Sequence, residues 1–247
     1  MTAFRTEELD WLLDSLEPGG PGPAGNWPVR CAELLDLDGV SVSTQSHSAE
    51  LIWYSGELST RLDDLQFTLG EGPSYVATRD GALCLVTDVR RSPGPCWPAF
   101  VPGALELGVQ SVFAFPLRLG ALRIGSLTGH RREARGMVEE SVDAALQICD
   151  ALTMFVLSSL RTPGREMVPT PVRGERPGGL HRAVVHQATG VLTVTLGVDL
   201  TTALDRLRAY AFAQDRPIVS VARDIVARRL RLPDDRPQTR DGPDGRG

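Results

Sequence analysis

The sequence predicts a mixed α+β domain, built on an antiparallel sheet with flanking helices, followed by a small all-α domain of three helices. Three observations lead to this fold class. Within residues 27–160, short segments of alternating apolar and polar residues occur in neighbouring pairs joined by tight turns, as in antiparallel hairpins. Residues 161–179 hold four prolines and four glycines without periodicity, which predicts a linker. Residues 180–232 repeat apolar side chains only at helical spacing.

The first domain follows an N-terminal segment, residues 1–26, which predicts an amphipathic helix near 6–16 and then an irregular stretch rich in proline and glycine. From residue 27 onward the pattern predicts, in order, a helix over 27–37, a hairpin over 39–56, a helix over 57–70, a strand over 83–87, a hairpin over 109–130 around Gly120, and a helix over 137–160.

The helix over 137–160 carries apolar or small residues at alternating steps of four and three, which a two-stranded helical seam requires. These residues are Val138, Val142, Ala145, Cys149, Leu152, Val156 and Ser159. Two interpretations stay open. Either one broad face packs on the domain's own sheet, or the seam also holds a partner helix in a parallel homodimer, which we favour because the apolar surface is wide.

The second domain, residues 180–232, is predicted to hold three helices. Gly197 ends the first helix, and Asp199 is placed to cap the start of the second. The sequence Asp215-Arg216-Pro217 ends the second helix, with Pro217 in the first turn of the third. Residues 233–247 are polar and rich in proline and glycine, and are expected to be disordered.

Composition excludes several kinds of site. All 26 basic residues are arginine, so a P-loop lysine and a Schiff-base lysine are excluded. Four widely spaced cysteines without nearby ligand-spaced histidines predict neither a metal site nor a disulfide framework. No segment has the length of uninterrupted apolar sequence that a membrane span needs, and the N-terminus is acidic, so we expect a cytoplasmic protein. The charge is also unevenly distributed: residues 1–160 hold 11 arginines against 21 acidic residues, whereas residues 180–232 hold eight arginines against four acidic residues. An acidic first part and a basic second part suggest two modules with different partners.

The stretch over 69–89, with Gly70 and Gly72 before Pro73, predicts a tight turn into a short helix. In a functional interpretation, this turn lies at the edge of a ligand cavity. With Trp97 and the later segment GVQSVFAFPL, residues 27–160 resemble a GAF domain. This resemblance implies a six-stranded antiparallel sheet, a small-molecule pocket between sheet and loops, and dimerisation through flanking helices. The expected pocket residues are Trp53, Ser74, Tyr75, Trp97 and Phe113.

Ser74 stands where many GAF domains of actinobacterial type carry a cysteine, which argues against a thiol response at this turn. Some GAF domains reduce free methionine sulfoxide with pocket cysteines. Here only Cys84 and Cys96 could serve, and their spacing matches no such motif. We therefore expect a non-enzymatic sensor that needs no cofactor and no metal, with this reductase as a minor alternative.

Residues 180–230 resemble the ANTAR domain, a three-helix RNA-binding module of bacterial transcription antitermination regulators. The residues that carry the resemblance are Arg182, Val185, Gln187, Ala188, Gly190, Ala203, Leu207, Arg208, Tyr210, Ala211 and the run VARDIV at 221–226. Thr189 replaces the family's lysine, and Leu204 replaces an aromatic residue. A GAF domain followed by an ANTAR domain is the order of a known class of antitermination regulators of actinobacterial type.

The resemblance implies a signal-responsive protein that binds RNA hairpins in nascent transcripts. Proteins that read RNA hairpins use arginines on phosphates and aromatic or amide side chains on bases. The expected RNA-binding residues are Arg182, Gln187, Thr189, Arg206, Arg208, Tyr210 and Arg216, with Arg223 beside them. The alternative is a helical module that serves protein docking or dimerisation.

Overall fold

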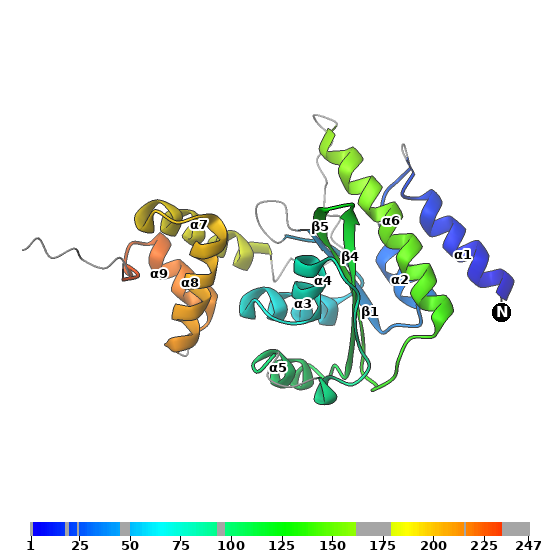
Figure 1. The fold of residues 1–247 in the computed structure, drawn as a ribbon, viewed down its shortest axis with the longest axis horizontal. Coiled ribbons are helices and arrows are strands. Elements are labelled where there is room, and N and C mark those ends of the chain that lie inside the picture. Colours follow the sequence, from blue (N-terminus) through cyan, green and yellow to red (C-terminus); the bar gives the residue numbers. More distant parts are fainter. Residues whose placement is uncertain are drawn as a thin grey trace, which may run out of the picture. The chain divides into compact units, whose positions relative to one another are not determined.

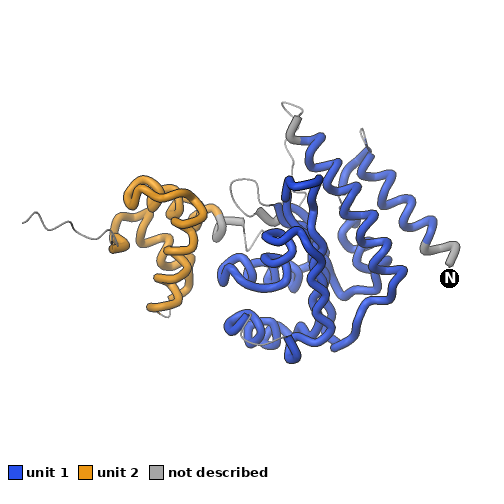
Figure 2. The backbone as a smooth tube through the Cα atoms, viewed as in Figure 1, with its two compact units in different colours: residues 1–182 blue, residues 183–247 orange. Residues whose placement is uncertain are grey.

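The computed structural model describes residues 2–17, 20–23, 25–44, 50–92, 97–161, 179–214 and 216–233. The chain divides into two compact units, residues 1–182 and residues 183–247 (Figure 2). Residues 162–178 of the predicted linker over 161–179, and residues 234–247 of the predicted tail over 233–247, lie outside the described residues.

The first unit is an α+β unit around one antiparallel sheet, so the predicted fold class is confirmed (Figure 1). Its helices are α1 (Thr2–Asp14), α2 (Trp27–Leu34), α3 (Glu57–Leu69), α4 (Pro73–Asp80), α5 (Phe100–Glu106) and α6 (Glu139–Arg161). Its strands are β1 (Gly39–Thr44), β2 (Glu50–Tyr54), β3 (Cys84–Val86), β4 (Ser111–Leu119) and β5 (Leu122–Arg131). A short 3₁₀ helix, η1, covers Val89–Arg91.

The strands lie in the order β2-β1-β5-β4-β3, with every neighbouring pair antiparallel. Both predicted hairpins are present. The β4–β5 hairpin turns at Gly120, whose φ of 58° lies in the left-handed region that glycine adopts without strain. Among the described residues the sheet has five strands, whereas the GAF resemblance implies six.

Helices cover both faces of the sheet (Figure 1). Helices α1, α2 and α6 lie on one side, and α3, α4 and α5 lie on the other. The larger apolar cluster fills the first side and includes Trp27, Phe113, Phe115 and Leu152. A smaller cluster, with Leu62, Trp97 and Phe100 among its members, lies on the side of α3 and α5.

Helix α5 was not predicted from the sequence, because Pro102 and Gly103 are both unfavourable in a helix. The structure supplies a cap from a distant turn. One carboxylate oxygen of Glu71 accepts hydrogen bonds from the backbone N–H groups of Ala99 and Phe100, at 2.8 and 2.7 Å. Such a contact satisfies orphan donors at the helix start and is invisible to local periodicity.

The expectation that the α6 seam is available to a partner helix is not supported by the fold. Ala145, Cys149, Leu152 and Val156 belong to the unit's own core. Two neighbours account for the wide apolar surface, because α6 packs on the sheet at β4 and also against α1 (Figure 1). By length and composition α6 could cross a membrane, yet this inward packing is that of a core helix.

The second unit consists of α7 (Gly179–Leu196), α8 (Leu200–Ala213) and α9 (Ile218–Val226), as predicted. Asp199 caps α8, accepting hydrogen bonds from the backbone N–H and the hydroxyl of Thr202 at 2.9 and 2.7 Å. Helices α7 and α8 meet at 107°. The inward residues of the unit are Val185, Ala188, Leu192, Leu196, Ala203, Leu207, Ala211, Ile218, Val221, Ala222 and Ile225.

Candidate ligand site and nucleic-acid interface

The sheet face beneath α3 and α4 is polar. Side chains alternate along a strand, so Val40 and Val42 enter the core beside α6 while Ser41 and its partner Thr128 face the opposite way. Along β5, Ser126 and His130 share the face of Thr128. Helix α4 packs against β4 and β5, and α3 packs against β1 and β5, so these polar side chains are buried.

Four residues on this side of the sheet, which we name the polar layer, bury atoms that lack a hydrogen-bond partner among the described residues. These are the hydroxyls of Ser126 and Thr128, Nε2 of His130 and Nε2 of Gln66. Every one of the four residues is at most 2% exposed. A buried polar atom without a partner costs about 1–3 kcal/mol. The polar layer is therefore a place where a polar molecule would gain hydrogen bonds.

Gln66 is held in place by the start of α4. Its Oε1 accepts the backbone N–H of Ser74 at 2.8 Å, which fixes the carboxamide and leaves its NH₂ group to donate elsewhere. The pKa of His130 is lowered to about 4. Burial is the main cause, Arg132 contributes to the lowering, and Asp38 opposes it. The imidazole is therefore neutral near pH 7, with one nitrogen able to donate and one able to accept.

The five pocket residues expected from the sequence do not come together. Trp53 and Phe113 lie on the opposite face of the sheet. There the ring of Trp53 packs edge-on against the ring of Phe155 of α6, with the ring centroids 6.0 Å apart. Phe113 shares that face because it alternates with Val112 along β4.

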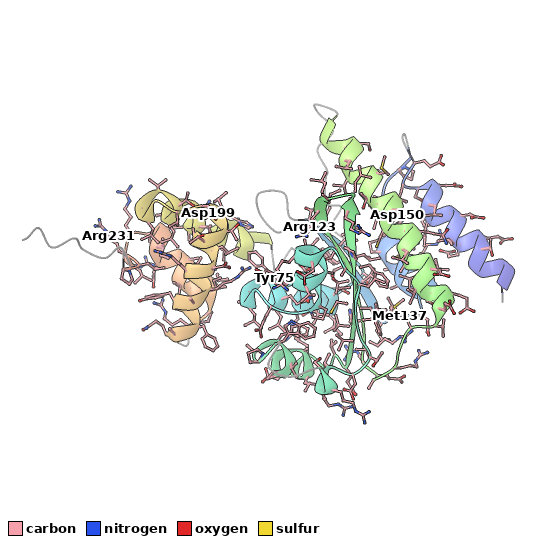
Figure 3. All side chains as sticks on the ribbon, in the orientation of Figure 1. Tyr75, Arg123, Met137, Asp150, Asp199 and Arg231 are labelled. Atoms are coloured by element: carbon pink, nitrogen blue, oxygen red, sulfur yellow. The ribbon has the colours of Figure 1, made fainter. Side chains whose placement is uncertain are left out.

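The other three lie on the side of α3, α4 and α5. Trp97 packs edge-on against Phe100, with the ring centroids 5.9 Å apart, as part of the smaller apolar cluster. Ser74 is buried in the first turn of α4, and Tyr75 beside it is half-exposed (Figure 3). Four of the five expected pocket residues are aromatic, and none of them belongs to the polar layer. The alternation of polar and apolar residues in GVSVST and GSLTGH could have indicated a polar face of the sheet.

The cysteines are poorly suited to redox chemistry. Burial raises the pKa of Cys84 to about 11 and that of Cys31 to about 12, and raises that of Cys149 well above its usual value. All three are free thiols, and at neutral pH they stay protonated, which makes them weak nucleophiles. Cys96 lies outside the described residues. Within the described part of the chain, no group of three or more histidine, cysteine or acidic residues could hold a metal ion.

In the second unit, several residues expected to contact RNA are engaged inside the protein. Arg208 pairs with Asp205 at 3.1 Å, and its side chain is only 12% exposed. Arg216 donates to Asp224 at 2.6 Å and to Ser220 at 3.1 Å. Thr189 is 4% exposed, and its hydroxyl donates to the carbonyl of Val185 at 2.8 Å, so it does not stand at the surface.

The remaining expected contacts differ in their exposure. Gln187 is exposed on α7, whereas Arg206 and Tyr210 on α8 are half-buried. The side chain of Arg182 lies outside the described residues. Arg223 is exposed on α9. The structure thus leaves Gln187, Arg206, Tyr210 and Arg223 at least partly accessible.

Comparison with protein families matches residues 180–226 to the ANTAR domain. Residues 180–226 form an ANTAR domain. The match spans α7, α8 and α9, so the ANTAR domain of this chain is the three-helix unit described above. The arginine-rich segment that follows α9, from residue 227 to 231, lies beyond the matched residues.

Several solved structures resemble part of the chain. Two are GAF domains of phosphoenolpyruvate-protein phosphotransferases. The one from Coxiella burnetii has 16% identity and a TM-score of 0.47, covering 64% of this chain and 95% of its own. The one from Acinetobacter has 9% identity and a TM-score of 0.49, covering 66% and 98%.

A third is the free methionine-R-sulfoxide reductase from Neisseria meningitidis, with 16% identity and a TM-score of 0.49, covering 64% of this chain and 92% of its own. No curated protein matches the sequence. The first unit is an antiparallel sheet with flanking helices, and the ANTAR domain follows it.

Proposed function

We propose that this protein is a signal-responsive regulator whose ANTAR domain binds RNA hairpins in nascent transcripts and thereby prevents transcription termination. The observation that carries the proposal is the ANTAR match over α7–α9. Residues 180–232, which include the match, hold eight arginines against four acidic residues. A bound protein that stabilises one hairpin excludes a competing terminator hairpin. The polymerase then continues through the site.

Accessible side chains of the domain supply the chemistry that RNA loops need. Tyr210 offers a ring on which an unstacked base can stack, and the carboxamide of Gln187 can donate to and accept from a base edge. Arg206 and Arg223 add positive charge near phosphates. In this proposal Arg208, paired within α8, and Arg216, paired with Asp224 of α9, serve the structure of the unit and do not themselves contact RNA.

The GAF-like unit is the proposed sensor, and the polar layer is its proposed ligand site. Hydroxyls, a carboxamide NH₂ and a neutral imidazole favour a small polar molecule rich in hydrogen-bonding groups. The raised thiol pKa values support binding without reaction, so we propose a sensor and not a methionine sulfoxide reductase. We further propose that the protein acts in the cytoplasm, as a homodimer.

The function is tested with the full chain and a library of synthetic RNA hairpins that share one stem and carry randomised loops. We expect enrichment of a subset of loops, and read-through of a terminator placed behind an enriched hairpin in transcription with purified polymerase. Enrichment without read-through would confine the function to RNA binding. If no loop is enriched, the proposal is wrong.

The ligand site is tested by thermal unfolding with a panel of nucleotides, amino acids and small organic acids. A ligand that raises the unfolding temperature of the wild type should do so less in Thr128→Val, which removes one hydroxyl of the polar layer. Thr153→Val is the matched control, because the hydroxyl of Thr153 is equally buried and unpartnered but lies on α6. Equal responses of all three proteins would place the ligand elsewhere.

One observation favours a second candidate function, in which the ANTAR domain docks a protein. Its surface exposes apolar side chains, with Val194 of α7 83% exposed and Phe212 of α8 78% exposed. Exposed aromatic residues are common anchors at protein interfaces. Substitution of Phe212 by Ser should abolish partner capture if docking is the function and should leave hairpin binding unchanged if RNA is the partner.

A further inference from the structure

Positive charge is unevenly distributed within the second unit. Residues 183–214, which contain α7 and α8, hold two arginines against two aspartates. Residues 216–233, which contain α9 and the segment after it, hold five arginines against one aspartate. The excess of cations therefore lies outside the two longer helices, chiefly at Arg228, Arg229 and Arg231, because α9 itself holds one arginine and one aspartate.

The arginines of this last part are also the more accessible ones. Arg223, Arg228 and Arg231 are exposed, and none of them pairs with a carboxylate that the structure describes. Figure 3 shows Arg231 on the segment that follows α9. Arg229 differs, because it donates to Asp224 at 2.9 Å.

The backbone after α9 holds these arginines in a defined turn. The N–H of Arg228 donates to the carbonyl of Ile225 at 2.9 Å, and the N–H of Arg229 donates to the carbonyl of Asp224 at 2.8 Å. The side chain of Asp224 in turn binds Arg216 and Arg229. This arrangement ties the turn to Arg216, which precedes α9, so Arg228 projects from an ordered turn.

Arg228 occupies a position that favours glycine. Its φ is 57°, in the left-handed region, where a side chain costs conformational energy and where helices commonly end with glycine. An arginine kept at such a position is a strained residue, and strained residues concentrate where a side chain has a function. Helix stability alone would be served better by glycine.

We propose that Arg223, Arg228 and Arg231 form the main phosphate-contacting surface for RNA. Arg228 and Arg231 lie beyond the residues matched to the ANTAR domain, so this surface extends the RNA interface outside the domain. The inference rests on the proposed RNA binding and adds the residues that neutralise the phosphates. Guanidinium groups suit this role because they bind phosphate oxygens through paired donors.

The test compares the full-length wild type with the variant Arg228→Gly/Arg231→Ala on hairpins enriched from the randomised-loop library. At low salt, hairpin affinity should fall on the order of tenfold or more, and the slope of log affinity against log salt should decrease by about two. The unfolding temperature of Arg228→Gly should be no lower than that of the wild type, because glycine relieves the left-handed backbone.

Arg61→Ala/Arg118→Ala is the matched control, since both arginines are exposed in the first unit and the double substitution removes the same two charges. It should leave hairpin affinity unchanged. If the double variant binds the enriched hairpins with wild-type affinity and salt slope, this inference is wrong while the proposed RNA function stands. If the wild type itself enriches no hairpin, both fail.

Discussion

His130 links the polar layer to pH. Burial lowers its folded-state pKa to about 4, whereas an unfolded histidine titrates near its ordinary value of 6.5. Between these two values the unfolded chain binds a proton that the folded chain does not. The stability that depends on neutral His130 is therefore present above pH 6.5 and is lost as pH falls toward 4.

We expect the first unit to lose about 2 kcal/mol of unfolding free energy between about pH 7 and about pH 5. Denaturant unfolding at the two pH values measures this loss. His130→Gln, which cannot titrate, should reduce it. The lowered pKa of Asp88, caused by its hydrogen bond with Arg90, affects stability only in stronger acid, outside this window. An unchanged pH dependence in His130→Gln would contradict the assignment.

Thr189 illustrates how burial changes the expected effect of a substitution. From the sequence, Thr189→Lys would restore the family's lysine and strengthen hairpin binding. Because Thr189 is buried, a lysine must thread its stem past packed neighbours to bring its ammonium group to water. We expect the variant to lose roughly 1–3 kcal/mol of unfolding free energy in the second unit.

Gln187→Lys is the matched comparison for Thr189→Lys, since Gln187 is exposed on the same helix and the substitution adds the same charge. It should leave the unfolding temperature unchanged, as followed by circular dichroism of the full chain. A Thr189→Lys variant that is as stable as Gln187→Lys and binds hairpins more tightly would restore the original expectation.

In helix α6, too, burial determines the expected effect of a substitution. Its seam was expected to hold a partner helix, yet Leu152 is fully buried in the unit's own core, whereas Met154, two residues later, is 58% exposed. Leu152→Ala should therefore cost about 3 kcal/mol of unfolding free energy. Met154→Ala should change it by less than about 0.5 kcal/mol. Chemical denaturation of the two variants measures the difference, and equal losses would contradict the assigned orientation of α6.

At the scale of the whole molecule, a homodimer through α6 must use the outward side of the helix, where Leu146 and Met154 are exposed. We expect the full chain to sediment as a dimer. Leu146→Glu/Met154→Glu should convert it to a monomer that still unfolds cooperatively, because neither residue is buried in the core of the first unit. A wild type that sediments as a monomer would rule out the dimer.

A change in the seam itself would not test dimerisation. Val142→Glu/Leu152→Glu, which changes two residues of that seam, places a carboxylate in the packed core at position 152. Unfolding of the first unit would then mimic loss of a dimer. Sedimentation of that variant would report folding and not assembly.

The sequence by itself determined the fold class, the two hairpins, the three helices of the ANTAR domain, the end of α7 at Gly197 and the cap at Asp199. Alternation along strands, helical spacing and the special conformations of glycine are local properties, so they can be read without knowing what packs against what. The ANTAR motif likewise lies in one continuous segment.

Only the tertiary structure decided which face each residue occupies. It placed Phe113 in the core beside α6 and His130 in the polar layer, and it tied Arg216 to Asp224. A periodic pattern shows that two faces differ, but both faces of this sheet are covered by helices, so polarity alone could not tell which side holds a ligand. Contacts such as Glu71 with the start of α5 join residues far apart in sequence, and only folding brings their atoms within hydrogen-bonding distance.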